Sequence, residues 1–161
     1  MNKKALFITQ AAMIAALYVV LTVFINAFGL ANGAIQVRIS EALTILPFFT
    51  PAAIPGLVIG CFISNWVTAC APWDVVFGSM AILIGALGTY ALRKYKFLAP
   101  VPPILANALI VPIILIKVYA VPDAYWFLLL TVGAGEVISC GILGMILLLS
   151  LNKYKDKIFR Q

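Results

Sequence analysis

Long apolar runs, separated by short polar or proline-containing breaks, fill almost the whole chain. The runs cover residues 5–28, 38–50, 52–71, 75–92, 98–119 and 124–151, with turns at 72–74 and 122–123 among the breaks. An α-helix rises 1.5 Å per residue, so about 20 apolar residues cross the hydrocarbon core of a bilayer. The pattern predicts one all-α domain over residues 1–161, an integral membrane bundle of six transmembrane helices.

The second run is too short to cross a membrane as an ordinary helix. Its core, EALTILPFFT, would measure only about 15 Å as an α-helix, and Pro51 then breaks the chain. We therefore expect this run either to begin near Arg38 or to lie behind other helices, without full contact with lipid.

Basic residues predict the orientation of the bundle. If the N-terminus is inside and every run crosses, nine of the eleven Lys and Arg residues lie on the inner side, as the positive-inside rule requires. These are Lys3, Lys4, Arg93, Lys94, Lys96, Lys153, Lys155, Lys157 and Arg160. If the second run did not cross, the cluster at 93–96 and the C-terminal tail would both face outside. We therefore expect a multi-pass protein of the cell membrane with both termini cytoplasmic.

Composition removes several classes of function. Hydrophobic residues make up 65% of the chain and charged residues 10%, against about 45–50% and about 25% in a soluble domain. The chain has no His, which excludes histidine acid–base catalysis and His-ligated metal sites, and it has no G-x-x-x-x-G-K-[ST] run to hold ATP phosphates. The net charge of +6 indicates basic cytoplasmic loops rather than nucleic-acid binding. We expect no cofactor, no metal and no enzymatic activity.

The most informative polar residue is Glu136, in the segment GAGEVISCG of the last run. It lies about 12 residues into that run, hence about 18 Å from the outer end of a helix. A carboxylate at that depth is costly and by default signals function. It can bind a substrate, relay protons or pair with a buried cation. The alternative is a protonated or hydrogen-bonded packing residue.

Two amides lie at comparable positions in other runs, Asn65 in the third and Asn107 in the fifth. Amides together with a carboxylate suit a ligand with several hydrogen-bond donors and acceptors. Each Asn fits equally well a role as a hydrogen bond between helices.

Charged and aromatic residues gather toward the predicted outer side. The charges at the mouth are Arg38, Glu41, Asp74, Lys117 and Asp123, which sum to −1 and favour a neutral or cationic solute. The aromatic residues are Trp66, Trp73, Tyr119, Tyr125 and Trp126. They are typical of an interfacial belt, or else they form a stacking wall for a flat heterocycle.

Small residues form a strip on the first run. Ala11 and Ala15 are four residues apart, as are Ala12 and Ala16, so each pair shares a helix face. Such a strip permits close helix contact, either inside the protein or against a partner.

Four segments together resemble the QueT family, and the likeness covers nearly the whole chain. They are VRISEALTILPFFTPAAIPGLVIGC, WDVVFGSMAILIGALGTYALRK, PPILANALIVP and GAGEVISCG. The resemblance implies a substrate-binding S-component of an energy-coupling factor (ECF) transporter, for which queuosine precursors are the proposed cargo. It also implies a site near the outer side, and partners consisting of a membrane scaffold (T) protein and two ATPase subunits. The alanine strip, in one of its two registers, looks like the surface that docks on the scaffold.

Queuosine precursors are 7-deazaguanines, flat molecules with adjacent N–H donors on one edge. A carboxylate accepts two parallel N–H bonds well. We therefore expect Glu136 to take that edge and Asn65 and Asn107 to contact the remaining polar atoms. We expect Trp66 or Trp73 to stack on the ring. Charged residues of the mouth complete the expected site: Asp74, which would attract an aminomethyl substituent, Arg38 and Glu41.

Three other functions compete with this interpretation. An S-component for another vitamin or small heterocycle is the strongest, because architecture does not specify a ligand. A stand-alone permease would use Glu136 as a proton or cation relay. A membrane enzyme would pair Asp74 with Glu136, but one is expected at the mouth and the other deep inside, and no G-x-S-x-G motif is present.

Overall fold

The computed structural model describes residues 2–29 and 37–158, without the side chains of residues 156 and 157. These ranges contain helices and no strand, which confirms the predicted all-α class. The elements are α1 (Lys3–Ala27), the 3-10 helix η1 (Ile39–Phe48), α2 (Ala53–Val67), α3 (Pro72–Ala91), α4 (Val101–Lys117), α5 (Tyr125–Glu136), the π-helix η2 (Val137–Leu143), α6 (Gly144–Asn152) and α7 (Lys155–Ile158). Arg160, the side chain of Lys157 and residues 30–36 between the first two predicted spans lie outside the described residues.

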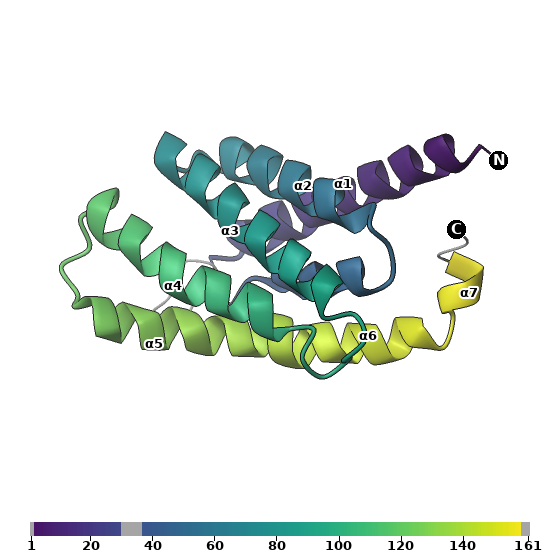
Figure 1. Cartoon of the computed structure of the whole chain (residues 1–161). Helices are drawn as coiled ribbons and strands as arrows, with labels where there is room; N and C mark the ends of the chain where they lie inside the picture. The colour runs from purple at the N-terminus through teal and green to yellow at the C-terminus, as the bar shows by residue number, and fades with distance from the viewer. Residues whose placement is uncertain (1, 30–36, 159–161) are drawn as a thin grey trace.

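Successive helices run back and forth along the bundle (Figure 1). The most extensive pairings join α1 to α2, α2 to α3, α3 to α4 and α4 to α5, so chain neighbours are also neighbours in space. The elements α5, η2 and α6 continue one another as a single rod, residues 125–152. The start of α1 and the short α7 lie at the same end of the bundle. We call this the terminal end and the opposite one, where α2 gives way to α3, the far end.

Three helices are long and apolar enough to cross a membrane: α1, α3 and the rod of residues 125–152. The helices η1, α2 and α4 are apolar but shorter. Large hydrophobic side chains such as Phe24, Leu130 and Ile146 are exposed on the outside of the bundle. Such an apolar surface suits contact with lipid rather than water. The count of six spans and the cytoplasmic position of both termini stay predictions.

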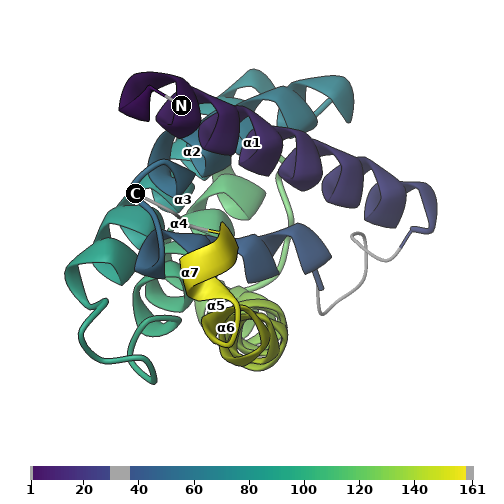
Figure 2. The same cartoon turned by 90° about the vertical axis from the view of Figure 1, so that its right-hand side faces the viewer.

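The second predicted span is a 3-10 helix in the middle of the bundle. In Figure 2 this segment, coloured dark blue, passes between α1 and α2 on one side and the rod of α5 and α6 on the other. Its ten residues measure about 20 Å, because a 3-10 helix rises about 2.0 Å per residue. Residues 40–47 are all buried. The short run therefore begins directly after Arg38 and also lies behind other helices.

Several predicted helix ends shift in the structure. The predicted turn at 72–74 is instead the start of α3, with Pro72 as its first residue. Proline is tolerated there because the N–H that it lacks has no partner within the helix. The helices α2 and α4 end earlier than predicted, at Val67 and Lys117. An alanine in the left-handed conformation follows each of them, Ala69 with φ of 57° and Ala120 with φ of 51°.

The contact between α1 and α2 is so close that α2 needs glycine there. A Cβ atom at Gly56 would lie 2.7 Å from the carbonyl oxygen of Ala11. A Cβ atom at Gly60 would lie 2.8 Å from the Cβ atom of Tyr18. Real Cβ atoms do not approach so near, so this packing depends on the two bare backbone positions.

The same contact separates the two alanine registers of α1. Ala15 is buried, and its backbone lies about 3 Å from where a Cβ atom of Gly60 would be. Ala11 stands in the same relation to Gly56. Ala12 and Ala16, in contrast, are exposed on the surface of α1. One register is thus used inside the protein, and the other is available to a partner.

We expect Gly60→Ala to lower the stability of the protein by about 1–3 kcal/mol, the usual cost of overpacking a filled contact. Thermal unfolding of the purified protein in detergent measures the change. Gly133→Ala is the matched control, because its Cβ atom would meet only Ala108, at an ordinary 3.7 Å. If both variants unfold at the temperature of the parent, the close packing of α1 on α2 is wrong.

Candidate functional site

A cavity of about 310 Å³ opens at the far end of the bundle. Its walls come from the second half of α1, the start of η1, the ends of α2 and α4 and the start of α3. Most of the lining side chains carry a polar group: Tyr18, Thr22, Asn26, Arg38, Ser40, Asn65, Thr68, Cys70, Asp74 and Tyr119. Ile25, Leu115 and Val121 complete the lining. A concave site with converging polar groups is the usual form of a small-molecule binding site.

Asp74 supplies the acidic group of this cavity. It lies in the first turn of α3 and is only 9% exposed. The Tyr119 hydroxyl donates a hydrogen bond of 2.8 Å to Asp74 Oδ2 and accepts one of 3.1 Å from the Ala71 N–H. The phenol thus links the start of α3 to the residues after α4 and holds the carboxylate in place.

Two strained residues lie at the rim of the cavity. Ala69 stands between the lining residues Thr68 and Cys70, and Ala120 stands between Tyr119 and Val121. The left-handed conformation costs a residue with a Cβ atom roughly 1–2 kcal/mol. Strain of this kind is concentrated at functional sites, because the surrounding structure must hold it.

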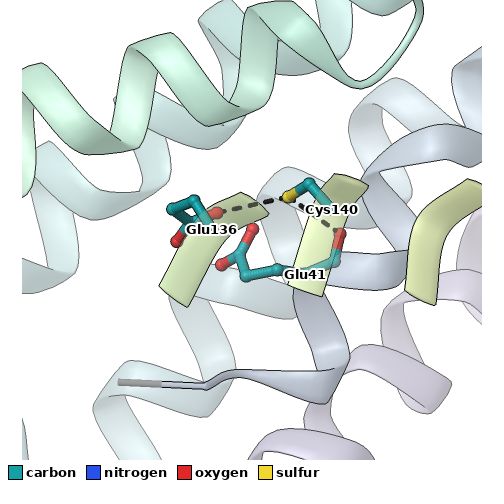
Figure 3. Close-up of side chains that lie close together, drawn as sticks. All are labelled: Glu41, Glu136 and Cys140. Carbon is teal, nitrogen blue, oxygen red and sulfur yellow. Dashed lines mark hydrogen bonds between the residues drawn. The ribbon is translucent and has the colours of Figure 1, made fainter. Parts of the chain in front are cut away.

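A second polar centre, the carboxylate cluster, lies behind the cavity wall. Glu41 is 1% exposed and Glu136 is 4% exposed, and their side chains meet beside Cys140 (Figure 3). One ligand atom from each of these three residues lies within 4.8 Å of the others. The sequence places Glu41 among the charges of the outer mouth, but the structure buries it in η1. The reason is that η1 passes through the interior instead of along the surface.

Hydrogen bonds from several helices hold the carboxylate cluster. The Tyr18 hydroxyl donates to Glu41 Oε1 at 2.7 Å, and Asn107 Nδ2 donates to Glu41 Oε2 at 3.3 Å. The Cys140 thiol lies 3.2 Å from Glu136 Oε2 and 3.4 Å from the Glu41 carbonyl oxygen. A buried carboxylate needs such donors, because an unpaired one would be strongly destabilising.

The π-helix η2 aligns the residues around the cluster. It begins directly after Glu136 and contains Ser139 and Cys140. Cys140 contacts both Glu136 and the backbone of Glu41, while Ser139 Oγ accepts a 3.1 Å hydrogen bond from the Arg38 N–H. Single π turns inside longer helices occur frequently at functional sites.

The donor set of the cluster, two carboxylates and one thiol, suits a divalent cation that accepts oxygen and sulfur ligands. Each of the three residues already has a hydrogen bond to another protein group. The cluster therefore joins α1, η1, α4 and η2 through hydrogen bonds.

Tyr18 connects the two polar centres. Its ring lines the cavity, while its hydroxyl is bonded to Glu41. Thr22, one turn later, donates to the Ser40 hydroxyl at 2.8 Å and also lines the cavity. Sequence reasoning missed Tyr18, Thr22 and Ser40. The signal for Tyr18 and Thr22 is a pair of polar tips at helical spacing on the face of α1 that also carries Ala11 and Ala15, whereas Ser40 lies in η1.

The residues predicted for the site divide into three groups. Those that line the cavity are Arg38, Asn65 and Asp74. Those that meet in the carboxylate cluster are Glu41, Asn107 and Glu136. Trp66 and Trp73 are 68% and 63% exposed and do not line the cavity, and the ring of Trp73 stacks on Phe77 with centroids 6.0 Å apart. Contact of any of these eight residues with a substrate stays a prediction.

Comparison with known proteins assigns the chain to a family. The family described as QueT transporter matches residues 8–153. A curated relative, the queuosine precursor transporter QueT of Lactococcus lactis subsp. cremoris (strain MG1363), is 36% identical over 97 residues, which are 59% of this chain and 56% of that protein. The match thus spans little more than half the length of this relative. No solved structure matches the chain. On the family match, the chain belongs to the QueT transporter family.

We expect Tyr18→Phe to destabilise the protein by about 1–3 kcal/mol, because Glu41 then loses its shortest hydrogen bond while it stays buried. Chemical or thermal unfolding in detergent measures the loss. Tyr95→Phe is the matched control, since Tyr95 is exposed. Equal stability of the two variants would show that the Tyr18 hydroxyl does not support the carboxylate cluster.

Proposed function

We propose, from its membership of the QueT transporter family, that this chain is the membrane-embedded S-component of an ECF-type importer. It captures a queuosine precursor of the 7-deazaguanine type at the outer side of the cell membrane. Partner subunits then use ATP to move the cargo inward. The single observation that carries this proposal, beside the family match, is the polar cavity of about 310 Å³ at the far end of the bundle.

The size of the cavity supports a small cargo. Ligand pockets generally measure about 300–1,000 Å³, and this one lies at the lower limit. It has room for one bicyclic heterocycle rather than for a long chain. The mixture of Asn, Thr, Tyr, Asp and Arg groups on its walls suits a ligand that carries both donors and acceptors.

The charge distribution supports a cavity that opens to the outside of the cell. The basic residues Arg93, Lys94 and Lys96 follow the end of α3, and Lys153 follows the end of α6. In the alternating course of the helices these positions belong to the terminal end, together with Lys3. The positive-inside rule then makes the terminal end cytoplasmic, and the cavity at the far end opens to the outside.

The sequence contains no phosphate-binding loop, so transport is passive, ion-driven or powered by other chains, and the resemblance to S-components favours other chains. We propose that a membrane scaffold protein, which carries two ATPase subunits, docks on α1. Of the two alanine registers, Ala11 and Ala15 already pack against α2, whereas Ala12 and Ala16 are exposed. The docking strip is therefore Ala12 and Ala16, where small side chains let a second helix approach closely.

We expect the purified protein to carry a guanine-like heterocycle, which mass spectrometry of the co-purified small molecules identifies.

The partly buried Cys70 lines the cavity, whereas Cys61 and Cys140 are fully buried. Added 7-deazaguanine ligand is therefore expected to slow alkylation of Cys70. A thiamine- or flavin-type ligand would favour an S-component for another cargo. Ion-driven uptake by the protein alone in liposomes would favour a stand-alone permease.

We expect Ala16→Leu to prevent co-purification with the scaffold and ATPase subunits while ligand binding is unchanged, because the larger side chain holds the partner helix away. Ala134→Leu is the matched control, since Ala134 is an exposed alanine on α5. Pull-down of the assembled complex measures the effect. Complexes that form equally with both variants would show that this register of α1 is not the docking strip.

A further inference from the structure

The cavity contains a carboxylate oxygen without a protein partner. Asp74 Oδ2 accepts the Tyr119 hydroxyl, but within residues 2–29 and 37–158 no group donates to Oδ1. Asp74 is nine-tenths buried. Among the described residues, the enclosed side-chain N or O atom without a partner is Gln10 Nε2, so Oδ1 of Asp74 is not enclosed and is open to the cavity that Asp74 lines. A carboxylate oxygen in this position can accept a hydrogen bond from a donor outside the protein.

The side-chain amide of Asn65 lies across Gly78 from the Asp74 carboxylate. A Cβ atom at Gly78 would lie 3.5 Å from Asp74 Oδ1 and 3.2 Å from Asn65 Nδ2. Asp74 and Gly78 are four residues apart in α3 and share a face of that helix. The one hydrogen bond of the Asn65 side chain within the described residues is a long contact of Nδ2 with Cys61 Sγ, at 3.6 Å. The amide oxygen of Asn65 thus remains available as a second acceptor.

The formal charge of the cavity does not require a cationic partner for Asp74. Arg38 lines the same cavity, and its positive charge acts mainly on Glu41 and least on Asp74. Among the described lining residues these two are the charged ones, so the cavity is close to neutral overall. An ammonium group would bring a second positive charge near Arg38, whereas a neutral N–H edge brings none.

We infer that Asp74, Asn65 and Gly78 form the specificity face of the cavity. Asp74 Oδ1 accepts the ring N–H and the exocyclic amino group of a flat neutral heterocycle, and Asn65 holds an adjacent polar atom. Gly78 leaves the space through which the ring reaches these groups, and Tyr119 is a positioning residue that orients the carboxylate. This inference rests on the proposed function and deepens it. It assigns to Asp74 the recognition of the N–H edge, for which the sequence favours Glu136.

The test compares two 7-deazaguanine ligands, one with the exocyclic amino group and one without it, by calorimetry on the purified full chain in detergent. We expect the parent to prefer the amino-bearing ligand by about 10- to 150-fold, the range for a hydrogen bond to a charged group. Asp74→Asn is expected to abolish this preference. Asp123→Asn is the matched control, because Asp123 is an exposed acid that does not line the cavity.

Gly78→Ala provides a second variant that keeps all charges. Its Cβ atom would stand between Asp74 and Asn65, so we expect it to weaken both ligands. If Asp74→Asn does not yield folded protein, two measurements still test the inference. They are the ligand preference of the parent and the loss of ligand affinity in Gly78→Ala. A parent that binds both ligands equally, or a Gly78→Ala variant that binds them as the parent does, overturns the inference.

A third ligand separates the N–H edge from a cationic substituent. It carries an aminomethyl group at position 7, and the matched ligand carries a methyl group there. If Asp74→Asn removes a preference for the aminomethyl ligand and leaves the preference for the exocyclic amino group, Asp74 binds a cation and the inference is wrong. If the parent binds none of these ligands, the proposed function itself fails, and the specificity face fails with it.

Discussion

The fold depends on the hydrogen bonds that stabilise the Glu41 carboxylate inside an apolar bundle. Glu41 has almost no contact with solvent, and its oxygens are held by Tyr18 from α1 and by Asn107 from α4. The two partners come from two different helices, so η1 is tied to both of them through one side chain. The carboxylate therefore fixes the position of η1 in the interior, and Tyr18 carries this constraint to the wall of the cavity.

The groups that line the cavity are distinct from most of the groups that support them. Groups such as Asp74 and Asn65 line the cavity, and the carboxylate cluster lies behind them. Tyr18 belongs to both sets, because it lines the cavity and its hydroxyl is bonded to Glu41. A transporter must hold a cargo strongly enough to select it and weakly enough to release it. Polar groups in the backing layer fix the geometry of the wall without adding contacts to the cargo. The π turn after Glu136 has a similar role, because it brings Ser139 and Cys140 to the same layer.

The sequence was sufficient for the parts of the structure that depend on local apolar length. The helical class, the approximate helix ends and the internal position of Glu136 follow from run lengths, because a residue within a long apolar run is buried by its neighbours. The burial of Glu41 could not be predicted in this way, since it lies next to a polar segment and only the surrounding helices decide whether η1 is covered. Tyr18 was missed for a related reason. A tyrosine in an apolar run is typical of an interface, and its partner is 23 residues away.

Two alanines in the left-handed conformation make the entrance of the cavity easier to open than its floor. Ala69 and Ala120 hold conformations that relax as soon as the adjoining helix ends loosen. The floor of the cavity, near Tyr18, has no such strain within the described residues and is fixed by the carboxylate cluster. Thermal fluctuations therefore reach the entrance before they reach the floor. Amide hydrogens at residues 68–70 and 119–121 should accordingly exchange with deuterium well before those of η1, because the entrance opens by local fraying while η1 stays in place.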